Sequence, residues 1–126
     1  MSTSEETPTC SYFISSNAHI LVAVFSGALV KKNAEVIDQA ATDLLGRPNA
    51  KWVVLSFQNV SAFDRVIVPS IAKLLKSLRD RNLTLRLCLL SPEARAFLDQ
   101  QGLLRDEEVA NDLPSALQDM KTARAA

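Results

Sequence analysis

The residues that could do chemistry are few in this chain of 126 residues, which has one histidine, His19, and two cysteines, Cys10 and Cys88. A serine nucleophile needs a general base beside it, and His19 would have to be that base for any serine of the chain. His19 stands among apolar residues of an expected strand, and no serine lies in the glycine-flanked pattern of a nucleophile elbow. We therefore expect no catalytic residue.

Metal and cofactor sites are equally hard to assemble. The two cysteines lack CxxC spacing, and one histidine cannot complete a zinc site with them, so both thiols are expected to be free. Gly27, Gly46 and Gly102 are too far apart to form a glycine-rich phosphate loop. The acidic cluster of a phosphoacceptor receiver domain is missing as well. The absence of such chemistry favours a binding module without metal or cofactor.

The charge balance limits the class of partner. The 14 basic and 14 acidic residues cancel, so no overall field favours nucleic acid or an anionic membrane. The first nine residues lack the basic start and apolar core of a secretion signal, and no apolar run approaches the roughly 18 residues of a membrane span. We expect a cytoplasmic protein that neither binds nucleic acid nor inserts into a membrane.

The length is that of one domain with a core of its own. We expect a disordered lead-in over residues 1–9, a single domain over residues 10–121 and a short tail over residues 122–126. The first elements of that domain are two strands, residues 10–14 and 19–25, joined by a loop of residues 15–18. Gly27 is expected to break the strand pattern, and a helix from about Asn33 ends at Gly46.

The centre of the chain predicts a buried strand and an amphipathic helix. Residues 52–57 are apolar except for Ser56, which is typical of a strand buried on both faces. After Pro69, apolar residues recur with helical spacing at Ile71, Leu74, Leu75 and Leu78. Because proline lacks an amide and fits the first position of a helix, we place the helix start near residue 69 and a long turn over residues 58–68.

The last third of the chain alternates between strand and helix signals. Residues 83–89 alternate leucine with more polar residues, which predicts a strand. Ser91 and Pro92 are typical of a helix start, and Gly102 of its left-handed end. Residues 103–109 are a loop or a short strand, and a final helix begins near Asp112, with Leu113, Ala116, Leu117 and Met120 on one face.

This order of elements predicts an α/β fold. Each strand-helix-strand passage implies parallel neighbours joined by a right-handed crossover, while the first two strands add an antiparallel hairpin. We expect a mixed sheet of four to five strands with an N-terminal hairpin and about four helices.

Four short motifs, in this order, resemble those of the STAS domain family over about residues 10–120. They are GAL at residues 27–29, the apolar strand at 52–57, NVSAFD at 59–64 and SPEARAFLDQQGL at 91–103. The family includes bacterial anti-sigma-factor antagonists and the cytoplasmic part of sulfate transporters. The resemblance implies a STAS-like fold and a role in protein–protein interaction.

One departure from the family concerns its switch. The family's turn usually reads Asp-Ser-Ser/Thr-Gly-Leu, and a kinase partner phosphorylates the second hydroxyl residue. In this chain Asp64 matches, but Arg65 and Val66 replace the hydroxyl residues and Ile67 replaces the glycine. Val66 therefore stands at the phosphorylated position and has no oxygen to accept phosphate. The resemblance implies a partner-binding surface made of Phe63, Asp64, Arg65, Val66, Ile67 and Ser70.

Two details of this turn have alternative interpretations. Ser61 is either a substitute phosphorylation site or, with Asp64, an S-x-x-D capping box. Residues 65–68 either form an exposed apolar knob with one charge, or residues 66–68 fold back into the core.

Three classes of function remain open. The first is a divergent regulator that resembles anti-sigma-factor antagonists and binds an anti-sigma factor or kinase-like protein. The second is a small STAS subunit of a lipid or anion transport system, with a transporter ATPase as partner, and the third is an enzyme or small-ligand sensor. Self-association as a homodimer through residues 66–68 is a further expectation.

Overall fold

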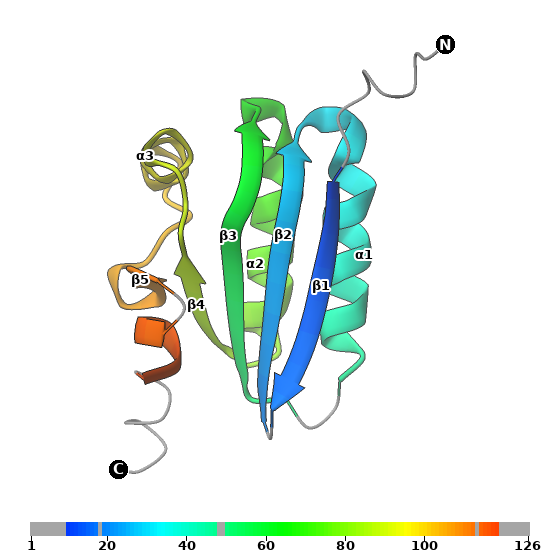
Figure 1. Ribbon diagram of the computed structural model, residues 1–126, viewed down its shortest axis with the longest axis vertical. Coiled ribbons are helices and arrows are strands. Elements are labelled where there is room, and N and C mark those ends of the chain that lie inside the picture. The colour runs from blue at the N-terminus through cyan, green and yellow to red at the C-terminus, as the bar shows by residue number, and fades with distance from the viewer. Residues whose placement is uncertain (1–9, 18, 48–49, 113, 119–126) are drawn as a thin grey trace.

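The computed structural model describes residues 10–17, 19–47, 50–112 and 114–118, and they form one five-stranded sheet with the strands in chain order (Figure 1). The strands are β1 (Cys10–Asn17), β2 (Ile20–Leu29), β3 (Trp52–Phe63), β4 (Thr84–Cys88) and β5 (Val109–Ala110). β1 is antiparallel to β2, and every other neighbouring pair is parallel. The predicted mixed sheet with an N-terminal hairpin is confirmed.

The helices lie in two places around this sheet. They are α1 (Ala34–Leu45), α2 (Val68–Asp80), α3 (Pro92–Gln100) and a short C-terminal helix of residues 114–118. Three single turns of 3-10 helix complete the elements: η2 (Lys31–Asn33), η3 (Arg65–Ile67) and η4 (Asp106–Glu108). In Figure 1, α1 and α2 pack side by side on one face of the sheet, whereas α3 lies beside the sheet beyond the end of β4.

The main core lies between the sheet and the pair α1 and α2. Alternate residues of β2, β3 and β4 face the helices, and both helices contribute residues at helical spacing. The fully buried side chains of this core include Phe25, Leu55, Leu87, Ile37, Leu44, Ile71, Leu75 and Leu78. The rings of Phe25 and Phe57 stack with centroids 5.4 Å apart, which joins β2 to β3.

A smaller core covers part of the opposite face of the sheet. Ile20, Val54 and Cys88 pack there against Ala116 of the C-terminal helix. The first half of β3 is therefore enclosed by β2, by β4 and by both cores, and residues 53–57 are all buried. The prediction of a strand buried on both faces is confirmed for this half.

The expected loop of residues 15–18 is wrong. Ser15, Ser16 and the backbone of Asn17 belong to β1, paired with Val22, Leu21 and Ile20 of β2. Serine and asparagine are common in turns, but cross-strand pairing with apolar residues outweighs this local preference here. His19 is a turn residue rather than the first residue of a strand.

The expected breaks at Gly27 and after residue 57 are also wrong, because β2 and β3 both run further. The pairing advances five residues along β2, from Val24 to Leu29, but seven along β3, from Ser56 to Phe63. The two extra residues sit at two register shifts, one of which follows Gly27, whose φ is 96°. Such bulges bend a strand without ending it.

The predicted helix ends are largely confirmed. Ser91 caps α3 by accepting a hydrogen bond from the backbone N–H of Ala94 at 3.1 Å, and Gly102 follows the helix with a φ of 72°. α2 begins at Val68, one residue before the expected position, with Pro69 in its first turn. Asp112 accepts from the N–H of Ser115 at 2.8 Å, which fits a helix start there.

Some expectations fall outside the described residues. Leu113, Met120, the lead-in of residues 1–9 and the tail of residues 122–126 are among them, and the domain limits stay predictions. Within the described part of the chain, none of the helices combines the length and hydrophobicity that a bilayer crossing requires. The same part contains no cluster of side chains suited to hold a metal ion.

Candidate functional site

The residues expected to bind a partner lie together at the end of β3, where the chain passes through η3 into α2. Asp64 organises this turn. Its Oδ1 accepts from the N–H of Val66 at 3.1 Å, its carbonyl accepts from the N–H of Ile67 at 3.0 Å, and its own N–H donates to the carbonyl of Leu29 at 2.9 Å. Asp64 therefore caps the turn and ties it to β2.

The capping-box interpretation of Ser61 is wrong. Ser61 is exposed within β3, three residues before the turn, and the cap is the carboxylate of Asp64 itself. Ser61 thus presents its hydroxyl on an extended strand, and Ser70 is half-buried in the first turn of α2. These are the hydroxyl groups nearest in sequence to the turn.

Residues 66–68 divide between surface and core. The side chain of Ile67 is fully buried, and Val68 is 8% exposed. Val66 is 52% exposed, and with Phe13 it is one of two large apolar side chains that are exposed in the described part of the chain. Of the two alternatives, folding back into the core is therefore right for Ile67 and Val68, which anchor the turn, and the exposed apolar knob is right for Val66.

Arg65 links the turn to α3. The guanidinium carbon of Arg65 lies 4.9 Å from the centre of the Phe97 ring, a cation–π contact between η3 and α3. Phe63 lies half-buried just before Asp64. The turn, the start of α2 and one side of α3 thus form a continuous surface at one end of the molecule.

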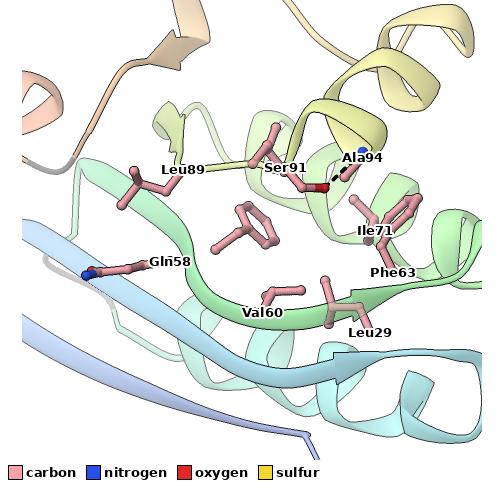
Figure 2. Close-up of a pocket in the computed structure, with 10 residues that line it drawn as sticks. Leu29, Gln58, Val60, Phe63, Ile71, Leu89, Ser91 and Ala94 are labelled. Carbon is pink, nitrogen blue, oxygen red and sulfur yellow. Dashed lines mark hydrogen bonds between the residues drawn. The ribbon is translucent and has the colours of Figure 1, made fainter.

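Next to this surface is a pocket of about 210 Å³, which sequence analysis missed. In Figure 2, Val60 and Phe63 of β3 and Leu29 of β2 line one side, and Ser91 and Ala94 at the start of α3 line the other. The remaining lining residues are Phe57, Gln58, Ile71, Leu89 and Leu90. Only Gln58 and Ser91 are polar, so the pocket suits an apolar group and offers no acid, base or nucleophile pair for catalysis.

The pocket exists because β4 stops early and its chain turns aside. β4 pairs with residues 52–56 of β3 only, and the next residue, Leu89, has a φ of 64°. This left-handed conformation is strained for a leucine, and here it directs the chain away from β3 toward α3. In the sequence, the short interval between the strand pattern and the helix start at Ser91 indicates a connection at this place. Nothing in the sequence indicates the direction that this connection takes.

Comparisons with known proteins identify the fold. A family model described as the STAS domain matches residues 14–116. The structure is similar to an anti-sigma factor antagonist from Mycobacterium paratuberculosis, at 16% identity and a TM-score of 0.75, over 90% of this chain and 95% of that one. It is similar to unphosphorylated SpoIIAA, an anti-sigma factor antagonist of Bacillus, at 14% identity and a TM-score of 0.68, over 92% and 98% of the two chains.

A transporter shares the same fold. The murine anion transporter Slc26a9 is 14% identical with a TM-score of 0.74, and the match covers 95% of this chain but 23% of the transporter. No curated protein matches the sequence. At these identities the structural matches establish the fold alone.

Proposed function

Because the chain belongs to the STAS domain family, we propose that it is a non-catalytic protein–protein interaction module, a divergent regulator related to the anti-sigma-factor antagonists. It works in the cytoplasm by binding a protein partner, such as a kinase-like anti-sigma factor, and so takes part in transcription regulation by partner switching. The observation that carries this proposal is Val66, an exposed hydrocarbon side chain held at the turn by Asp64.

Val66 takes the place of the hydroxyl residue by which the family is switched. Phosphorylation adds close to two negative charges, which would repel or recruit a partner at such a turn. A valine cannot be modified in this way, so the proposed docking does not depend on that modification. The surface consists of Phe63, Asp64, Arg65, Val66 and Ser70, with Ile67 fixing the turn from within the core.

A phosphorylation assay tests the missing switch. The full chain and a Val66→Ser variant are incubated with the kinase-type anti-sigma factor of the source organism, and phosphate is located by mass spectrometry. We expect phosphate on the variant at residue 66 and none on the natural chain between residues 61 and 70. Phosphate on Ser61 or Ser70 of the natural chain would contradict the proposal.

A second candidate function is that of a small STAS subunit of a membrane transport system. The similarity to Slc26a9, an anion transporter, favours it. Copurification separates the two candidates, since a transporter ATPase would support this one and a kinase-like anti-sigma factor the first. Either partner should be lost with Val66→Asp and retained with Phe13→Asp, because both variants place a charge on an exposed apolar residue but only the first does so at the turn.

The proposal includes self-association through a smaller contact than the sequence predicts. With Ile67 and Val68 in the core, Val66 alone is left to make a homodimer contact through the turn. Light scattering at high protein concentration tests it, and a monomer would remove it.

A further inference from the structure

The second half of β3 has one free edge. Residues 59–63 pair with β2 on one side, but the pairing of β3 with β4 ends at Ser56. In Figure 1, β3 continues past the end of β4 to the level of α3, and among the described residues no other strand takes the place of β4 there. Backbone N–H and C=O groups on an unpaired edge are a template for another strand.

This edge lacks the protection that free edges usually carry. Residues 58–63 read QNVSAF and include no charged residue and no proline, the two features that commonly prevent a foreign strand from pairing with an edge. Four of the six, Gln58, Asn59, Ser61 and Ala62, are exposed. This stretch is therefore exposed and carries none of the usual protection against an added strand.

The pocket adjoins the same edge. Phe57, Gln58, Val60 and Phe63 of β3 line it on one side, and residues from Leu89 to Ala94 line it on the other. Its volume of about 210 Å³ lies below the ~300–1,000 Å³ of typical small-molecule pockets and matches one large side chain. No charged residue lines it, so its occupant is apolar and neutral there.

We propose that the partner contributes an extended segment that adds to the free edge of residues 58–63, in the space between β3 and α3. One aromatic or large aliphatic side chain of that segment fills the pocket. Main-chain hydrogen bonds supply affinity and the pocket supplies specificity, as in other cases of strand addition. The inference rests on the proposed function, because it describes how the same end of the molecule holds its partner.

Peptides provide a probe that does not require the natural partner. A phage-displayed library of random twelve-residue peptides is panned on the full chain, and enriched peptides are synthesised. We expect an alternating pattern with one aromatic or large aliphatic residue in common. On binding, amide hydrogen exchange of the natural protein should slow over residues 58–63, and NMR shifts should change there and in α3.

Two variants make the test specific. Val60→Trp fills the pocket from β3 and should weaken peptide binding at least tenfold, while Phe13→Asp, at an exposed position of β1, should leave it unchanged, since Phe13 is not a pocket residue. Thermal melting shows whether each variant folds. If Val60→Trp does not fold, the exchange measurement on the natural protein decides.

Several outcomes would overturn the inference. The first is that no peptides are enriched, and the second is that amide exchange slows along β1 instead of β3. The third is that a folded Val60→Trp variant binds peptide with unchanged affinity. The fourth is that small apolar molecules displace bound peptide from the pocket while amide exchange in β3 is not slowed by the peptide. Failure here leaves the proposed function standing, because that proposal is judged by the loss of the protein partner with Val66→Asp.

Discussion

The two halves of β3 have the same neighbour, β2, on one side and different surroundings on the other. Residues 52–56 pair with β4 and are covered on both faces, whereas residues 58–63 face a pocket and α3. The first half is buried from Val53 onward, and the second is half-buried or exposed throughout. One strand thus serves as the centre of the core along one half of its length and as an open edge along the other.

The stability of this domain and its proposed binding are thus carried by different stretches of one element. Burial of apolar surface stabilises the first half, while the second half, as proposed above, offers backbone groups and a pocket to a partner. A substitution should therefore affect either the free energy of unfolding or binding, according to the half in which it falls.

The largest expected effect is a difference in the free energy of unfolding between substitutions in the two halves of β3. Leu55→Ala removes a fully buried side chain from the first half and should lower the free energy of unfolding by about 2–5 kcal/mol. Val60→Ala, in the second half, should lower it by less than about 1 kcal/mol because Val60 is half-buried. Urea denaturation measures both. Equal losses of stability in the two variants would contradict the division of β3 into a core half and an edge half.

The next effect concerns the residue at which β4 leaves the sheet. Leu89→Gly and Leu89→Ala remove the side chain alike, but only glycine relieves the left-handed φ of 64°. We expect the glycine variant to be the more stable of the two by about 1 kcal/mol. The opposite sign is expected at Ala96, an exposed position inside α3, where Ala96→Gly should cost about 1 kcal/mol. Thermal unfolding of the variants decides.

An effect of similar size on the free energy of unfolding is expected at the start of α3, which lines the pocket opposite β3. Ser91→Ala removes the cap of α3 and should cost about 1 kcal/mol in the free energy of unfolding. Ser61→Ala, on the exposed second half of β3, should change it by less than about 0.5 kcal/mol. Were Ser61 a helix cap, the two losses would be similar. Chemical denaturation of both variants provides the measurement.

The smallest expected effect on stability should accompany a large effect on binding. Ala62→Lys places a charge on the exposed second half of β3 and should change the free energy of unfolding by less than about 0.5 kcal/mol. It should still weaken the selected peptides, since lysine on an edge opposes strand addition. Gln39→Lys, exposed on α1, serves as the matched control. Equal peptide affinity in the two variants would contradict the assignment of the edge.

Sequence was most informative where a residue pattern repeats. The alternation and helical spacing that place Leu55, Leu75 and Leu87 in the core predicted the strands and helices that carry them. Local chemistry at Ser91 and Gly102 predicted both ends of α3. The family turn at Asp64 could be located from its neighbours in the motif.

The sequence was least informative where tertiary contacts decide the local conformation or the burial of a residue. Residues 58–63 contain Gln58, Asn59 and Ser61, which favour a turn, and only the pairing with β2 keeps them extended. The pocket depends on the direction taken by the backbone at Leu89, for which a leucine gives no sign. Ile67 and Val66 are both β-branched and apolar, so their opposite exposure follows from the hydrogen bonds of Asp64 and could not be assigned beforehand.

The two bulges of β3 have a consequence for how such a chain can change its length over evolution. Loss of one residue between Gln58 and Phe63 would convert a bulge into regular pairing and still deliver the chain to Asp64. The same deletion among residues 53–56, where the pairing with β2 has no shift, would turn the side chains that follow to the wrong face of the sheet. Deletions should therefore be tolerated best in the second half of β3, the part proposed to bind the partner, so that this half can diverge while the hydrophobic core stays fixed.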